Sequence, residues 1–172
     1  MAPVSDGLGA EALRSARARL RDLKARGDKA LARLTESDLE WAPDPESNSV
    51  AVLVQHLAGN MRSRWTDFLT ADGEKPDRDR DGEFEAGPGA SREALLARWE
   101  EGWGHVFRAL EELRPEDLTR EVVIRGRNTS ALNAINAQLV HYGEHVGQIL
   151  WIAKHRCGDR WESLSVPRRP RV

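Results

Sequence analysis

The sequence has little of what stabilises secreted or membrane proteins. It has one cysteine in 172 residues, so a disulfide within the chain is excluded and a reducing compartment is expected. It has no uninterrupted apolar stretch near the roughly 18 residues that a membrane span needs. Residues 1–9 lack the basic cluster and apolar run of a signal peptide. Together these absences predict a cytoplasmic protein with no membrane partner.

An excess of charge of one sign is also lacking. The 26 Lys and Arg residues nearly balance the 28 Asp and Glu residues, and the formal net charge is -2. Because nucleic-acid binding requires a basic surface, this balance argues against a nucleic-acid partner. Arg168, Arg169 and Arg171 gather near the C-terminus, and we interpret them as a solvated tail. Lysine is scarce beside arginine, a bias typical of GC-rich bacterial genomes.

The apolar residues that are present follow a helical pattern. They make up 40% of the chain, enough for one core in a single domain over residues 1–172. Four segments repeat them every three or four positions, as helices do when they bury one face. Serines suited to N-capping precede the last three segments. The predicted helices cover about residues 13–34, 49–70, 91–113 and 130–156.

The connections between these helices differ in length. Residues 71–90 are rich in Asp, Gly and Pro without a helical period, which predicts one long loop of functional length. Residues 121–125 form a short extended piece with no partner for a sheet. Gly27 should loosen the first helix, since Gly costs about 1 kcal/mol relative to Ala inside a helix, and Gly158 should end the last. We therefore predict an all-α four-helix bundle with a long loop between helices 2 and 3.

A pair of histidines in the fourth predicted helix is the sharpest chemical feature. His141 and His145 stand four residues apart, which places them on one helix face with Cβ atoms about 5–6 Å apart. Two such imidazoles can bind one metal ion, although a polar surface pair has the same spacing. His56 lies on the core side of the second predicted helix. A buried histidine needs a partner, either a metal or a hydrogen-bonding neighbour.

The other candidate residues are less well placed. His105 shares a helix face with charged residues and is expected to be solvated. His155 lies about 21 Å along the helix axis from His141, so one metal cannot reach both. Cys157 falls beyond the face that bears the histidine pair, and we interpret it as a bystander thiol.

Two stretches of the sequence resemble a known superfamily. Residues 55–60 read Gln-His-Leu-Ala-Gly-Asn, and residues 141–149 combine the histidine pair with Val-Gly-Gln-Ile. Together they resemble the DinB/YfiT-like superfamily, most closely an uncharacterised branch of its metal-binding bundles. The likeness extends from about residue 11 to residue 168. Shorter shared stretches are residues 60–68, 72–76, 124–126 and 163–168.

This resemblance implies a metal site and a class of reaction. It implies a four-helix bundle in which His56, His141 and His145 hold one divalent metal ion. Imidazole ligands suit zinc or nickel, our expected metals, and also iron. Better-known relatives are transferases or isomerases that use a low-molecular-weight thiol such as bacillithiol, mycothiol or glutathione. We therefore expect a thiol S-transferase that acts on a small electrophilic substrate.

Three histidine ligands leave at least one coordination position open, as in catalytic zinc sites. A thiol in that position would lose its proton, and water would become hydroxide near neutral pH. A metal-dependent hydrolase is therefore the first alternative. A non-enzymatic, stress-associated metal-binding protein is the second. That second role requires a fourth protein ligand, for which Asp67, Asp72 and Glu144 are candidates.

Polar residues near the histidines are candidates for positioning or proton transfer. Glu144 and Gln148 are the predicted catalytic residues, which would handle protons or orient groups. Gln138 and Asn60 lie about one helical turn from a histidine and could orient an imidazole. Residues 141–145 also match the H-x-x-E-H signature of one metalloprotease class, but the large protease scaffold is missing. No E-x-x-H pair of a di-iron bundle is present.

Tryptophan is abundant for a bundle of this size. Aromatic residues are enriched at protein interfaces, and related bundles are often homodimers. We therefore predict a symmetric homodimer in which some of these side chains are covered. The residues concerned are Trp65, Trp99, Trp103, Trp151 and Trp161.

Overall fold

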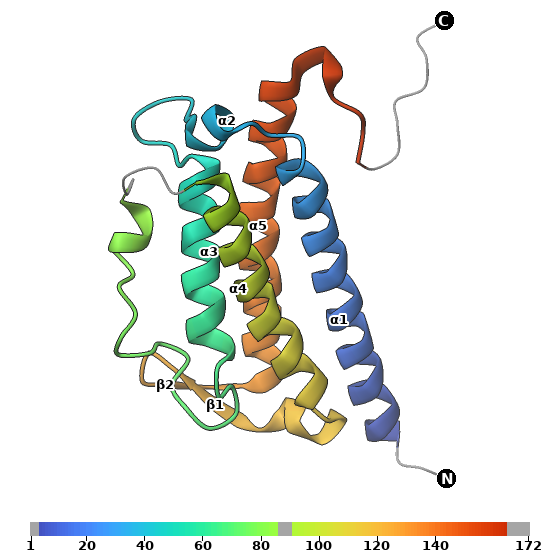
Figure 1. Ribbon diagram of the computed structural model, residues 1–172. Coiled ribbons are helices and arrows are strands. Elements are labelled where there is room, and N and C mark those ends of the chain that lie inside the picture. Colours follow the sequence, from blue (N-terminus) through green and yellow to red (C-terminus); the bar gives the residue numbers. More distant parts are fainter. Residues whose placement is uncertain (1–3, 86–90, 165–172) are drawn as a thin grey trace, which may run out of the picture.

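The computed structural model of the chain describes residues 4–85 and 91–164. Within these residues the fold is mostly helical, and four long helices run side by side (Figure 1). They are α1 (Val4–Leu31), α3 (Val50–Trp65), α4 (Arg92–Glu112) and α5 (Ala131–Cys157). The predicted all-α class is confirmed, with additions that the sequence did not indicate. These are a short helix, α2 (Glu36–Glu40), and a small two-stranded sheet.

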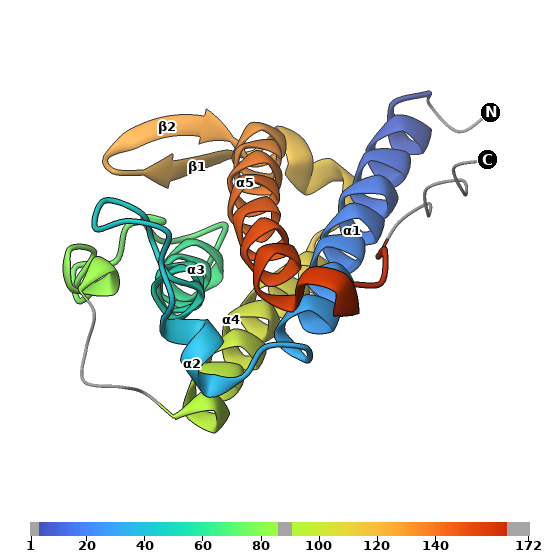
Figure 2. The same cartoon turned by 90° about the horizontal axis from the view of Figure 1, so that it is seen from above.

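The long helices pack in two pairs around one apolar core. Helix α3 packs chiefly against α4, and α1 chiefly against α5, as the view along the bundle shows (Figure 2). The large side chains of Trp99, Trp103 and Tyr142 are fully buried between them. Burial of such residues contributes roughly 1.5–3 kcal/mol per large apolar side chain before entropy is counted. The core therefore holds α3 beside α5, the two helices that carry the three candidate ligands.

Side-chain caps explain where three of the helices begin. The hydroxyl groups of Ser49, Ser91 and Ser130 accept hydrogen bonds from the third backbone N–H of α3, α4 and α5, at 3.3, 3.2 and 3.2 Å. Gly158 ends α5 with a positive φ of 55°. The predicted caps and the predicted stop are confirmed. Helix α3 ends at Trp65 instead of about residue 70, because the chain turns through a positive φ of 52° at Asp67.

The prediction that Gly27 loosens the first helix is wrong. Helix α1 continues through this residue to Leu31. A Cβ atom at Gly27 would lie 2.5 Å from the ring of Trp99, so the glycine makes room for a core tryptophan. The indole N–H of Trp99 then donates to Asp28 Oδ1 at 2.7 Å. Gly27 is therefore a packing residue between α1 and α4.

The prediction that residues 121–125 lack a strand partner is also wrong. Strand β1 (Glu121–Ile124) pairs antiparallel with β2 (Arg127–Ser130), directly before α5. Arg125 and Gly126 form the turn with positive φ angles of 55° and 70°, as a two-residue hairpin of this kind requires. The Asp72 carboxylate accepts both turn N–H groups at 2.8 Å. This contact ties the segment after α3 to the hairpin.

The tryptophans divide between core and surface. Trp65, Trp99 and Trp103 are buried in the core of the chain itself, so they are not available to an interface. Trp151, on α5, is 56% exposed. The homodimer stays a prediction, and Trp151 is the most exposed of the tryptophans named for it. A dimer mass by light scattering at micromolar concentration would support it, and a monomer mass would contradict it.

Two further sequence predictions concern membrane-spanning segments and the C-terminal arginines. No helix among the described residues has the length and apolar character needed to cross a membrane. The predicted tail residues Arg168, Arg169 and Arg171 lie outside the described residues.

The packing of Gly27 leads to a stability test. Gly27→Ala should lower the free energy of unfolding by about 1–3 kcal/mol, because the added methyl group overpacks the contact with Trp99. Gly104→Ala is the matched control, since a Cβ at this α4 position meets nothing within 4 Å. That change should stabilise the helix by up to about 1 kcal/mol. Urea unfolding measures both, and equal stability of the two variants would contradict the packing role.

Candidate metal centre

Three histidine side chains converge between α3 and α5. The Nε2 atom of His141 lies 3.2 Å from Nε2 of His56 and 3.1 Å from Nε2 of His145. Nitrogen ligands at about 2.0–2.1 Å from one ion in tetrahedral arrangement would lie about 3.3 Å apart. Both distances fit ligands of a single divalent metal ion, and the three histidines form one group whose potential ligand atoms lie within 4.8 Å of one another.

A hydrogen-bonded chain beneath the histidines sets the spacing of α3 and α5. The indole of Trp65 donates to the Tyr142 hydroxyl at 2.8 Å, and that hydroxyl donates to Asn60 Oδ1 at 3.0 Å. All three residues are buried. Burial also raises the pKa of Tyr142, so the hydroxyl keeps its proton. Asn60 thus joins the two helices through Tyr142. This role differs from the predicted one, which was to orient an imidazole.

The outer nitrogen atoms of two histidines contact fixed acceptors. His56 Nδ1 lies 3.0 Å from Glu83 Oε2, and His145 Nδ1 lies 2.9 Å from Gln148 Oε1. An acceptor oxygen at Nδ1 favours the tautomer that carries its proton there, which leaves the Nε2 lone pair for a metal. Gln148 is therefore hydrogen-bonded to the imidazole that it was predicted to orient. His141 Nδ1 is buried without a partner in the described part of the chain.

Glu83 is the site residue that the sequence analysis missed. It lies in a short 3-10 helix, η1 (Gly82–Phe84), inside the predicted loop. Its side chain is 8% exposed and accepts two hydrogen bonds from Arg78, both at 2.7 Å. Burial would raise the pKa of Glu83, but the hydrogen bonds from Arg78 and His56 outweigh it and lower that pKa. The carboxylate is therefore charged where it faces His56.

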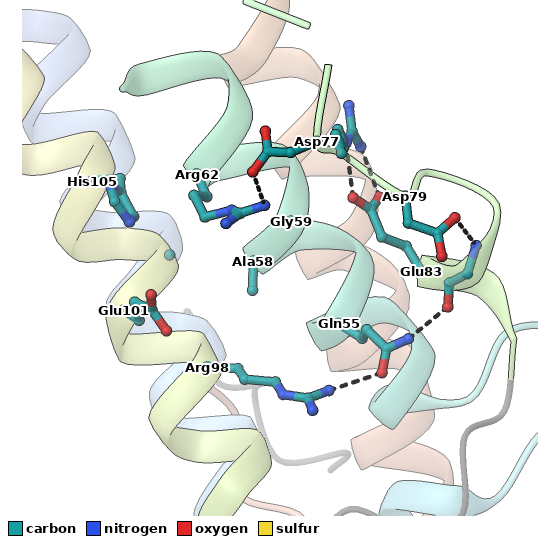
Figure 3. Close-up of a pocket in the computed structure, with 13 residues that line it drawn as sticks. Gln55, Ala58, Gly59, Arg62, Asp77, Asp79, Glu83, Arg98, Glu101 and His105 are labelled. Atoms are coloured by element: carbon teal, nitrogen blue, oxygen red, sulfur yellow. Dashed lines mark hydrogen bonds and ion pairs between the residues drawn. The ribbon is translucent and has the colours of Figure 1, made fainter. Parts of the chain in front are cut away.

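Gly59 makes the approach of Glu83 to α3 possible. A Cβ atom at this position would collide with the Glu83 carboxylate. The segment that carries Glu83 is held further by Gln55, which donates to the Gly82 carbonyl at 2.8 Å and accepts from Arg98 at 2.9 Å (Figure 3). These contacts cross from α4 over α3 to residues 77–83. The loop is thereby fixed against the bundle at the point where it meets His56.

A cavity of about 510 Å³ lies between α3, α4 and residues 77–83, and the residues that line it are drawn in Figure 3. His105 lies on its wall, half-buried, with Nδ1 3.4 Å from Thr66 Oγ1. The prediction of a solvated His105 is therefore wrong in part, because α3 covers one side of it. Burial, and then the charge of Arg108, lowers its pKa. Among the described residues His105 is not part of the group of converging histidines.

The protonation state of two of the converging imidazoles suits metal binding. Burial, followed by the neighbouring His145 and His56, lowers the pKa of His141 to about 3. Burial also lowers the pKa of His145. Metal ligation requires neutral imidazole, and these two side chains are neutral at physiological pH. The three rings line one cavity of about 410 Å³.

Comparison with known families places the chain. Residues 7–170 match the family described as "Protein of unknown function (DUF1572)". The chain belongs to this family. No curated protein matches the sequence. The family description names no activity, so the function of this DUF1572 member is inferred from the chemistry of the site.

The predicted fourth ligands of this DUF1572 member lie elsewhere. Within the described residues, the group of potential ligand atoms that meet within 4.8 Å of one another comprises the three histidines alone. Asp72 accepts backbone N–H groups at the hairpin turn, and Asp67 is exposed. Glu144 is exposed on α5 and lines a separate groove with Gln148 and Trp151. The described structure thus brings none of the three acidic candidates to the cluster.

His155 and Cys157 also lie apart from the cluster. The His155 ring stacks on Trp41 and Trp151, with ring centroids 5.0 and 5.7 Å apart. Cys157 is buried, with Sγ 3.9 Å from the Arg33 carbonyl oxygen. His155 therefore packs between two tryptophan rings, and Cys157 packs against the backbone after α1.

The convergence of the histidines predicts one metal ion per chain. Purified protein loaded with zinc or nickel should hold about one equivalent, measured by elemental analysis. His141→Ala should lower affinity at least about 100-fold, more than the loss of an outer-shell partner, in competition with a chromophoric chelator. His105→Ala should leave affinity unchanged, and equal losses at the two positions would refute the assignment.

A second prediction isolates the part of Glu83. Glu83→Gln should lower metal affinity about 10–100-fold, because the outer-shell carboxylate that orients and polarises His56 is lost. Glu85→Gln, an exposed neighbour with the same change of charge, is the control. If both variants bind zinc as the unmodified protein does, Glu83 has no part in the site.

Proposed function

We propose that this protein is a metal-dependent transferase that joins a low-molecular-weight thiol to a small electrophilic molecule. The observation that carries the proposal is the meeting of three imidazole Nε2 atoms on one cavity wall. The resemblance of residues 55–60 and 141–149 to the DinB/YfiT-like superfamily supports the same reaction class.

His56, His141 and His145 would hold the metal, for which zinc or nickel is our proposal. When bound, such an ion supplies Lewis acidity, which lowers the pKa of a thiol that enters the site. The protein's own residues supply orientation and shielding. Glu83 and Gln148 keep two imidazoles turned toward the centre. The Phe84 ring covers the His56 ring, with centroids 4.4 Å apart, and excludes water from that side.

Glu144 and Gln148 take unequal parts in this proposal. Gln148 acts as a positioning residue through its hydrogen bond to His145. Glu144 lines the groove beside Gln148 and not the cavity of the three histidines. The hydrogen bond to His145 supports Gln148 as the orienting residue, and the place of Glu144 in the neighbouring groove supports a lesser part for it.

The proposal predicts a response of the metal to thiols. Glutathione, bacillithiol or mycothiol should change the near-ultraviolet and visible absorption of the cobalt-loaded protein, because sulfur ligands give intense bands there. Gln148→Ala should weaken the response about 10–100-fold. His141→Ala should abolish it, together with any conjugating activity on a panel of electrophiles.

Two outcomes would redirect the assignment. If no thiol alters the spectrum, thiol transfer is refuted. Turnover of an ester panel by the zinc-loaded protein would then favour the hydrolase. Tight metal binding without turnover would favour the non-enzymatic role.

A further inference from the structure

The wall of the three-histidine cavity carries four arginines and no carboxylate. Two of these arginines are buried, and the other two lie at the rim of the cavity. The lining residues other than the histidines are Asn60, Arg64, Arg78, Arg80, Phe84, Arg125 and Gln138. A cavity whose charged lining residues are all arginines favours an anionic occupant.

The two deep arginines are built into the scaffold. The side chains of Arg64 and Arg78 are 7% and 2% exposed. Buried charges are tolerated only when they are paired. Arg64 pairs with Glu74 at 2.8 Å and also donates to the Gly73 carbonyl, while Arg78 pairs with Glu74 at 3.2 Å and with Glu83 at 2.7 Å. Two carboxylates thus balance these two guanidinium groups.

The two rim arginines have donors to spare. Arg125 gives only Nε to Glu74, at 3.0 Å, and Glu74 already contacts both deep arginines. Arg80 lies 3.8 Å from an oxygen of Asp81, whose side chain is 96% exposed and therefore solvent-screened. Its guanidinium group also lies over the Phe84 ring, 5.9 Å from the ring centroid, which is a cation–π contact and not a hydrogen bond. Both side chains are about half exposed, at 55% and 53%. Their free N–H groups can bind an anion in the paired geometry that guanidinium favours.

A buried amide beside these arginines also lacks a partner. Gln138 is 8% exposed and lines the same cavity. Its Oε1 atom has no hydrogen-bond partner within the described residues. A buried polar atom without a partner is unfavourable, and a ligand that donates a hydrogen bond to it would remove this cost. The unpaired Gln138 Oε1 atom is an observation separate from the charges of the arginines, and it points to a ligand in the same cavity.

We propose that this cavity binds a small molecule with an anionic oxygen group, a carboxylate or a phosphate. Arg80 and Arg125 hold the anionic group, and Gln138 accepts a hydrogen bond from the rest of the molecule. The deep arginines supply a positive background and position the wall. The proposal rests on the proposed function in so far as the three-histidine cavity is the reaction site, and it names the substrate class for that site.

Matched thiols that differ in charge test the proposal on the cobalt-loaded protein. 3-Mercaptopropionate should bind at least about 10-fold more tightly than neutral 2-mercaptoethanol, and cationic cysteamine should bind more weakly than either, because each rim arginine adds a charge-assisted contact. In the double variant Arg80→Gln, Arg125→Gln the preference for 3-mercaptopropionate should fall to less than about 3-fold. Its affinities for 2-mercaptoethanol and for zinc should stay unchanged.

Arg62→Gln is the control for the loss of positive charge. Arg62 lines the cavity of about 510 Å³ and not that of the three histidines, and it pairs with Asp77 at 3.2 Å, so this variant should keep the full preference. A preference that survives in the double variant would show that the carboxylate binds the metal instead of the rim arginines, and would overturn the proposal. Equal binding of the three thiols to the unmodified protein would also overturn it, while thiol binding itself would stand.

A thiol-free measurement separates this proposal from the proposed function. Inorganic phosphate and propionate are titrated into the zinc-loaded protein, and the unfolding temperature is followed. Stabilisation that the double variant loses would support the anion site even if no thiol binds, and the stronger of the two anions identifies the group. Absence of stabilisation by both anions, together with equal thiol affinities, would refute the anion site.

Discussion

The buried contact between His56 and Glu83 is the interaction on which the rest of the site depends. Glu83 accepts from Nδ1 of His56 and so turns Nε2 toward His141. A buried carboxylate lowers the stability of the fold unless a cation pairs with it. Arg78 pairs with Glu83 through two hydrogen bonds. Gly59 gives the carboxylate room against α3. Removal of any one of these groups would leave a buried charge or an unoriented imidazole.

The same contacts make the segment after α3 a part of the scaffold. Glu74 joins three arginines in the cavity wall, and Asp72 binds the turn of the hairpin before α5. Residues 72–84 therefore connect α3 with the start of α5 on the side where the histidines meet. A loop tied by buried ion pairs can hold side chains as firmly as a helix does. The cavity wall is for this reason built from loop residues.

Apolar packing and polar chemistry occupy different sides of α3. Leu53, Leu57 and Met61 are buried in the core that holds the bundle together. His56 and Arg64 face the polar segment. Nearly all of the buried polar atoms on that side are paired. Among the described residues, the buried atoms of the cavity lining that lack a partner are Gln138 Oε1 and His141 Nδ1, and a ligand that reached them would complete their hydrogen bonds.

Local patterns in the sequence were enough to determine the helices and part of the site. Apolar spacing located the long helices, serine side chains marked three helix starts, and the four-residue spacing placed His141 and His145 on one face, since each depends on residues within about one turn. The core position of His56 followed from its apolar neighbours. Its partner did not, because a loop residue such as Glu83 carries no periodic signal.

Only the tertiary structure decided the pairings between distant segments. The hairpin partner of residues 121–124, the room that Gly27 leaves for Trp99 and the half-buried setting of His105 each depend on which elements pack together. The gathering of four arginines around three histidines has the same origin, because they come from α3, α5, the hairpin and the segment between α3 and α4. The sequence by itself therefore indicated the three histidines as candidate ligands, and the path of one loop decided what surrounds them.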